Sequence, residues 1–80
     1  MPTVLLFASI AQAAGTRRAR IEASTLAGVL SDAARRFGDA FAEQLPHCRL
    51  AVNGEPVDLS SPMTLGVDDE VAILPPVSGG

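Results

Sequence analysis

The last six residues of the sequence, Pro75-Pro76-Val77-Ser78-Gly79-Gly80, could do chemistry through a terminal carboxylate. The two prolines favour a stiff, extended start without internal hydrogen bonds. The two glycines have no side chains, so their backbone can thread a narrow channel and leaves the carboxylate open to attack. Fully extended, the segment reaches about 20 Å. We therefore predict a tail over residues 75–80 whose reactive group is the Gly80 carboxylate.

A carboxylate is a poor acyl group because its charge resists nucleophiles and its leaving group is poor. Adenylation by ATP removes both obstacles, and the mixed anhydride then accepts an amine, a thiol or a sulfide. We therefore expect Gly80 to be the substrate of an activating enzyme that uses ATP, with no permanently bound cofactor. The alternative is a sequence that ends in glycine by chance. The compact domain that is expected before this short tail favours the functional interpretation.

The composition argues against a nucleic-acid partner. The net charge is -3 and the pI is ≈ 4.8, whereas nucleic-acid binders usually show a basic patch and a high pI. The only basic cluster, Arg17, Arg18 and Arg20, is interpreted as a solvated loop. All 6 basic residues are arginine, so the chain has no side-chain ammonium for an isopeptide or a Schiff base. A lysine needed for such chemistry must come from another protein.

The single cysteine, Cys48, excludes an internal disulfide and fits a reducing, cytoplasmic setting. Cys48 and its neighbour His47 lack the paired spacing of a zinc site, so we expect no metal. A persulfide on Cys48 is one possible sulfur chemistry. However, a lone cysteine at the start of an apolar strand is usually an inert core residue.

The apolar run over residues 4–14 resembles a secretion signal, but no basic residue precedes it. It is also shorter than the about 20 residues that a membrane span needs. We interpret it as a buried strand followed by a loop, and no membrane partner is expected. Residues 9–16 could form a single helical turn that ends at Gly15.

The clearest element that could position the tail is an amphipathic helix. Five apolar residues recur on one face at helical spacing: Leu26, Val29, Leu30, Ala33 and Phe37. Ser24 or Thr25 can cap its N-terminus, and Gly38 can take a left-handed position after its C-terminus. Arg35 and Arg36 lie in the last turn, where cations interact favourably with the helix dipole. Residues 40–45 could form one more turn, stopped by Pro46.

Apolar or alternating runs predict strands over residues 3–8, 20–23, 48–52 and 70–74. Asn53-Gly54 is a strong hairpin signal because both residues tolerate positive φ. Pro56 restricts the returning strand to an edge. We interpret residues 68–70 as a solvated acidic turn. The order predicts an α+β fold with one main helix on one face of a mixed sheet. Its first and last strands should lie side by side in the centre.

These segments resemble the small subunit of molybdopterin synthase, a sulfur carrier of the MoaD type in the MoaD/ThiS family, within the ubiquitin-like β-grasp superfamily. The resemblance rests on residues 4–8, Ala14-Gly15, the segment 51–54 and, most specifically, the segment 69–80. The last of these reads Asp-Glu-Val-Ala-Ile-Leu-Pro-Pro-Val-Ser-Gly-Gly. Ala11-Gln12 replaces a common Arg-Glu pair, and Val67-Asp68-Asp69-Glu70 stands where members often have Asp-Gly-Asp-Glu. The resemblance implies a β-grasp domain over residues 1–74 and a Gly-Gly tail over 75–80.

The resemblance also implies a mechanism. A MoeB-type enzyme would adenylate Gly80, and a sulfurtransferase would convert it to a thiocarboxylate. The tail would then enter a MoaE-type large subunit and donate sulfur to cyclic pyranopterin monophosphate, within a heterotetramer of two small and two large subunits. The chain itself would supply no catalytic side chain. Tail recognition would involve Pro75, Pro76, Val77, Ser78 and Gly79, and the docking candidates on the sheet face away from the helix are Leu74 and Val77.

Two other functions stay open at this point. Sulfur carriers of the thiamine, cysteine or tRNA-thiolation pathways also end in Gly-Gly, although Pro-Pro-Val-Ser favours molybdopterin. A ubiquitin-like modifier that is joined to lysines of many targets would use the same C-terminus.

Overall fold

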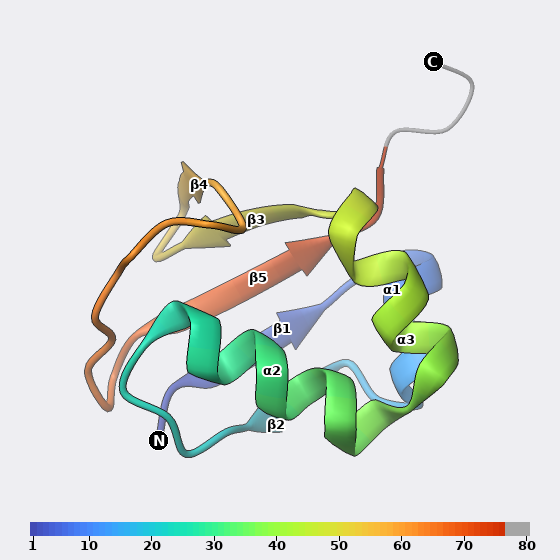
Figure 1. Cartoon of the computed structure of the whole chain (residues 1–80), viewed down its shortest axis with the longest axis horizontal. Helices are drawn as coiled ribbons and strands as arrows, with labels where there is room; N and C mark the ends of the chain where they lie inside the picture. Colours follow the sequence, from blue (N-terminus) through green and yellow to red (C-terminus); the bar gives the residue numbers. More distant parts are fainter. Residues whose placement is uncertain (77–80) are drawn as a thin grey trace.

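The computed structural model describes residues 1–76, and residues 77–80 lie outside this part. Within residues 1–76, nine elements follow one another, and most connections between them are short (Figure 1). In chain order they are β1 (Thr3–Leu6), α1 (Ala8–Ala14), β2 (Arg18–Arg20), α2 (Leu26–Phe37), α3 (Asp39–Gln44), the 3-10 turn η1 (Leu45–His47), β3 (Arg49–Val52), β4 (Glu55–Val57) and β5 (Glu70–Leu74).

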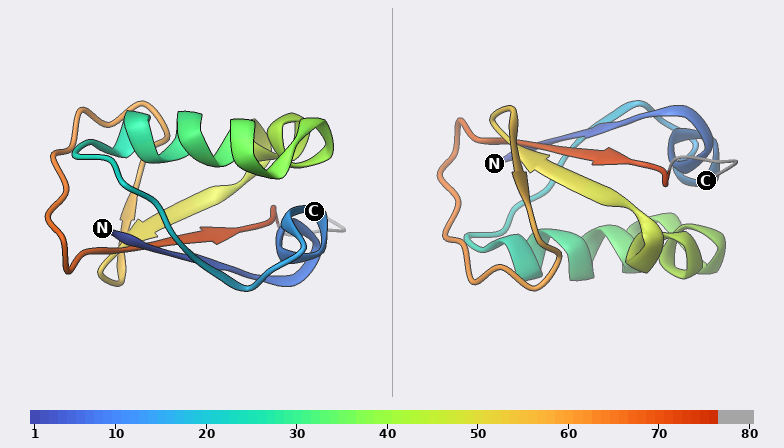
Figure 2. Two further views of the ribbon diagram at one scale, coloured as in Figure 1. Left: turned by 90° about the horizontal axis from the view of Figure 1, so that it is seen from below. Right: turned by 90° about the horizontal axis from the view of Figure 1, so that it is seen from above.

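The five strands form one mixed sheet in the order β2-β1-β5-β3-β4. β1 and β5 pair in parallel at the centre, with Val4 opposite Val71, and the other three pairings are antiparallel. Helices α2 and α3 lie along one face of the sheet, and α1 lies at the end where β5 finishes (Figures 1 and 2). The predicted α+β arrangement with central first and last strands is confirmed.

The core lies between the sheet and α2, and it is mainly aliphatic. The fully buried side chains include Val4, Ile21, Leu26, Val71 and Ile73. Among the aromatic residues only Phe41 is buried, and its ring meets Phe37 edge-on at a centroid distance of 5.1 Å. The strands and the main helix therefore pack mainly through branched side chains, in a chain whose only aromatic residues are 3 phenylalanines.

The first segment departs from the prediction of a strand over residues 3–8 followed by a loop. The strand ends at Leu6, and α1 begins at Ala8, whose φ is 49°. An alanine-rich segment favours helix, and Ile10 is completely buried, so packing stabilises two turns where we predicted one. Gly15, with φ 78°, ends the helix as predicted. Phe7, expected in a buried strand, is 44% exposed.

The second strand was predicted over residues 20–23 but spans Arg18–Arg20. Two residues of the supposed basic loop are therefore part of the sheet, with their side chains exposed. The register places Arg18 opposite Leu5 and Arg20 opposite Thr3, so pairing with β1 sets the strand limits.

The main helix is confirmed over the predicted residues 26–37. Thr25, rather than Ser24, provides the cap, because its Oγ1 accepts the Gly28 N–H at 3.0 Å. Gly28 leaves room for this cap, since an added Cβ would lie 3.1 Å from Thr25 Oγ1 and 3.2 Å from Ala23 Cβ. Gly38 has φ 93° but ψ -174°, so its conformation is not the predicted left-handed helical one.

The later elements agree closely with the sequence patterns. Leu50 and Val52 of β3 face the core together with Cys48, as predicted. Asn53 and Gly54 have φ values of 51° and 85° and form the predicted two-residue hairpin. Pro56 lies in β4 at the edge of the sheet. Pro46, expected to stop the preceding helix, lies inside η1.

Among residues 1–76, no helix is long and apolar enough to cross a membrane.

Candidate functional site

The base of the predicted tail lies at the end of the central strand. β5 finishes at Leu74, between the last residue of β1 and the first residue of β3. Pro75 is half-buried and Pro76 is exposed. The remaining predicted site residues, Val77, Ser78, Gly79 and the reactive Gly80, lie outside the described residues, so their predicted roles stay predictions.

The packing of β5 fixes the point from which the tail leaves the domain. Val71 and Ile73 are completely buried on the helix side of the sheet. On either side, β1 pairs with β5 through Ile73 and β3 pairs with it through Leu74. Because β5 has a neighbouring strand on each side and two buried side chains, it is a rigid element. The position of the first residue of the tail is therefore well defined.

The sheet face away from α2 carries an apolar surface next to the base of the tail. Leu5 lies opposite Ala72, and Ala72 lies opposite Ala51, so three half-buried side chains form one row. Leu74 follows Ala72 on the same side and is 38% exposed. Phe7 continues the extended backbone of β1. It lies two positions after Leu5, so its side chain is on the same side of the sheet.

We call this set the sheet surface: Leu5, Phe7, Ala51, Ala72 and Leu74. Leu74 was predicted as part of this surface, but Phe7 was not, because the uncharged run over residues 3–8 shows no alternation of polar and apolar residues. The two-residue spacing places Leu5 and Phe7 on the same face, but it does not say which face is outward.

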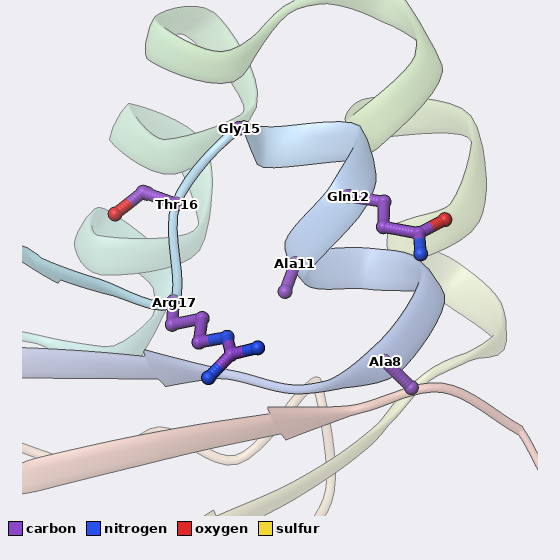
Figure 3. A pocket seen from close by; sticks show the side chains of 6 residues that line it. All are labelled: Ala8, Ala11, Gln12, Gly15, Thr16 and Arg17. Carbon is purple, nitrogen blue, oxygen red and sulfur yellow. The ribbon is translucent and has the colours of Figure 1, made fainter.

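Two arginines border the sheet surface. Arg49 is exposed and lies opposite Leu74 in the sheet. Arg17 lines a shallow pocket of ≈ 390 Å³ together with Leu5, Leu6, Phe7 and Ala8. It also lines a neighbouring pocket of ≈ 340 Å³ under α1, shown in Figure 3, which contains Ala11 and Gln12. The two positions that differ from the common Arg-Glu pair therefore lie in a pocket that Arg17 shares.

Cys48 does not look like a reactive thiol. Its side chain is 7% exposed and its Sγ donates to the Gln44 carbonyl at 3.3 Å. Burial raises the pKa of the thiol, so the protonated form is favoured. A sulfur nucleophile needs the thiolate, so this environment argues against a persulfide role. Within residues 1–76, no group of three His, Cys, Asp or Glu side chains could hold a metal ion.

The acidic turn before β5 includes one residue, Asp69, with a structural role that the sequence did not predict. Asp69 Oδ2 accepts the Gly66 N–H at 2.7 Å, and its Oδ1 accepts the Asn53 amide at 3.0 Å. The Gly66 bond, followed by the Asn53 bond, lowers the pKa of the Asp69 carboxyl. Asp68 and Glu70 are exposed, as a solvated turn predicts.

Comparison with known proteins agrees with this arrangement. Residues 4–80 match the ThiS family. SAMP1 from Haloferax volcanii is 33% identical, covering 99% of this chain and 98% of that chain, with a TM-score of 0.71. No curated protein matches the sequence.

Two further structures carry names from molybdopterin chemistry. In the complex of subunits 1 and 2 of molybdopterin-converting factor from Helicobacter pylori, the similar chain is 29% identical, with a TM-score of 0.68, covering 99% of this chain and 97% of that one. A putative molybdopterin converting factor subunit 1 from Pyrococcus furiosus is 25% identical, with a TM-score of 0.79, covering 95% and 97%. With the ubiquitin-like β-grasp fold and a family match over nearly its whole length, the chain belongs to the ThiS family of ubiquitin-like sulfur carriers.

Proposed function

We propose that the chain is the small, sulfur-donating subunit of molybdopterin synthase, and that the Gly80 carboxylate is its reactive group. The observation that carries the proposal is the position of β5, which ends at the sheet surface and leads directly into Pro75-Pro76-Val77-Ser78-Gly79-Gly80. The 29% identity to a chain of the Helicobacter pylori subunit 1 and 2 complex supports the choice of pathway.

The proposed chemistry takes place in partner proteins. In a MoeB-type enzyme, the Gly80 carboxylate attacks the α-phosphate of ATP and pyrophosphate leaves. A sulfurtransferase then supplies sulfide equivalents, which displace AMP and leave a thiocarboxylate. In a MoaE-type subunit, this sulfur passes to cyclic pyranopterin monophosphate. The chain contributes an accessible acyl group and no catalytic side chain of its own, and any lysine involved belongs to a partner because the chain has none.

The proposed docking mode uses the sheet surface together with the tail. Phe7 and Leu74 are two of the four large hydrophobic residues exposed in the described part of the chain, and both lie next to the base of the tail. Aromatic and aliphatic anchors of this kind contribute most of the binding energy at protein interfaces. We propose that the large subunit and the activating enzyme cover this same surface. The chain would then bind these two partners one at a time, and its complex with the large subunit would be the heterotetramer.

The test uses the thiocarboxylated chain, a MoaE-type subunit and cyclic pyranopterin monophosphate. We expect molybdopterin dithiolene to form in proportion to the thiocarboxylate consumed. A Phe7→Ser variant, which removes an exposed anchor, should reduce the rate, while Asp68→Ala on the opposite end of β5 should not. Consumption of thiocarboxylate without dithiolene, or transfer to a thiamine, cysteine or tRNA precursor instead, would contradict the pathway.

A second function has a specific observation in its favour. The 33% identical relative is SAMP1, and a structure of the same protein describes it as a small archaeal modifier protein. A protein modifier would join the Gly80 carbonyl to lysines of many targets. A denaturing immunoblot against this chain separates the two functions: a ladder of covalent conjugates would support the modifier, and a single band of the unconjugated chain would support the carrier.

A further inference from the structure

The turn between β3 and β4 is tied to the start of β5 through the side chain of Asn53. Asn53 Oδ1 accepts the Glu70 N–H at 2.9 Å, and Asn53 Nδ2 donates to Asp69 Oδ1 at 3.0 Å. Asp69 Oδ2 in turn accepts the Gly66 N–H at 2.7 Å. We call these four residues, Asn53, Gly66, Asp69 and Glu70, the Asn53 clasp. It joins segments 16 or more residues apart at the end of the sheet opposite the tail.

The residue after Asn53 gives the clasp a chemical weakness. Gly54 has no Cβ, so its backbone nitrogen is sterically open to attack the neighbouring carboxamide. In that reaction the Gly54 nitrogen loses its proton and bonds to Asn53 Cγ, and ammonia leaves. Water then opens the succinimide at either carbonyl, giving aspartate or isoaspartate. The overall reaction consumes one water and releases one ammonia, and it needs no other reactant.

The folded geometry opposes this ring closure. Both polar atoms of the Asn53 carboxamide are engaged, and the group must give up both hydrogen bonds to rotate toward the Gly54 nitrogen. The backbone is also fixed, because Asn53 at φ 51° and Gly54 at φ 85° form the two-residue turn that pairs Val52 with Glu55. We propose that Asn53 is a latent deamidation site, which the clasp protects in the folded chain and which reacts when the clasp opens.

The reaction would prevent the clasp from closing again. An aspartate at position 53 has no N–H to donate and would place a second carboxylate against Asp69, where like charges repel. An isoaspartate would also lengthen the backbone of a two-residue turn and disturb the pairing of Val52 with Glu55. Deamidation therefore makes the opening of the Asn53 clasp permanent. The clasp lies at Glu70, the first residue of β5, which is the strand that leads to the tail.

The experiment compares Asp69→Ala with Asp68→Ala in the full chain. Both variants remove one carboxylate from adjacent positions, but only Asp69 belongs to the clasp. After incubation at mildly alkaline pH, peptide mass spectrometry measures deamidation of Asn53, and circular dichroism confirms the fold. We expect several-fold faster deamidation in Asp69→Ala than in the native chain, and no acceleration in Asp68→Ala. Equal rates in the native chain and Asp69→Ala, or equal acceleration in both variants, would overturn the proposal.

A second comparison needs no variant and decides the matter if Asp69→Ala does not fold. The native chain is incubated beside a synthetic peptide of residues 49–57, which has the same Asn-Gly pair but no Asp69. Slower reaction in the folded chain supports protection by the clasp. A folded chain that deamidates as fast as the peptide, or a peptide that does not deamidate, would overturn it.

Discussion

Cys48 is the one side chain whose chemistry could compete with that of the tail. Its Sγ is buried and donates to the Gln44 carbonyl, and burial raises the thiol pKa, so the reactive thiolate is disfavoured. Asp69 has the opposite character. It is charged, lies at the surface and accepts two hydrogen bonds that lower its pKa. Cys48 therefore stabilises the core, and Asp69 stabilises the contact between the β3–β4 turn and the segment before β5.

Cys48→Ser should keep sulfur-carrying activity and lose about 1 kcal/mol of stability, because a more polar hydroxyl replaces a buried thiol. The hydroxyl can still donate to the Gln44 carbonyl, which limits the loss. Chemical denaturation gives the stability, and thiocarboxylate formation gives the activity. A folded variant that no longer accepts sulfur would revive the persulfide interpretation.

Asp69→Asn should change how stability depends on pH. The folded pKa of Asp69 is lowered, so its charged form adds stability above the unfolded pKa, and this contribution is lost as pH falls through the folded pKa. The native chain should therefore exceed Asp69→Asn in melting temperature near neutral pH, and the difference should shrink in acid. Asp68→Asn, at a position outside the clasp, is the matched control. A difference that stays constant with pH would show that the charge is not responsible.

At the scale of elements, both edges of the sheet are protected against pairing with another chain. On β2, Thr16 Oγ1 donates to the Arg18 carbonyl at 2.9 Å, and Arg36 Nη1 donates to the Arg20 carbonyl at 3.0 Å. On β4, Pro56 has no N–H to offer. Such features prevent edge-to-edge association, which leaves the sheet surface as the open side of the sheet.

Arg36→Ala should be more destabilising than Arg35→Ala, by about 1 kcal/mol, because it removes a charge-assisted hydrogen bond between α2 and β2. Arg35 only pairs with Asp32 within its own helix, and its side chain is 78% exposed, so its contribution should be near zero. The two variants carry the same charge change one residue apart. Denaturant titration measures both, and equal losses would show that the contact with Arg20 contributes nothing.

The elements also show what the sequence could and could not predict. The apolar spacing of residues 26–37 and the Asn53-Gly54 pair are local signals, and both elements were predicted at their observed positions. Helix α1 was predicted only as a possible single turn, because a short alanine-rich segment resembles a loop until the burial of Ile10 is known. The Asn53 clasp was missed because it joins residues 16 and 17 positions apart, which no local pattern reveals. Of the site, the exposed Leu74 was predicted, whereas the roles of the tail residues stay predictions.

At the scale of the whole molecule, the acidic turn and the predicted tail lie at opposite ends of β5. Residues 68–70 form an acidic segment at the start of β5, and the predicted tail begins after Leu74 at its other end, where Arg49 lies opposite Leu74. Figure 1 shows β5 running between these two ends. From Ala72 to Gly80 no side chain is ionisable. An uncharged segment loses little on desolvation, and its prolines limit the freedom that binding removes.

Binding to the large subunit should therefore depend weakly on salt, because screening acts on exposed charge pairs. Val77→Asp should weaken binding much more than Arg17→Ala, by placing a carboxylate where we expect an apolar contact. Titration of the two subunits at low and high ionic strength, with both variants, measures this. A steep loss of affinity with salt, or a larger effect of Arg17→Ala, would mean that the charged border dominates the interface.

The central claim is that the Gly80 carboxylate accepts the sulfur, and intact mass spectrometry tests it most directly. The native chain, a chain lacking Gly80 and a chain extended by one residue are each incubated with ATP, an activating enzyme and a sulfur source. We predict that only the native chain gains the mass of an oxygen-to-sulfur exchange, located at Gly80, while all three melt at nearly the same temperature. Thiocarboxylate on the extended chain, or sulfur located on Cys48, would contradict the account.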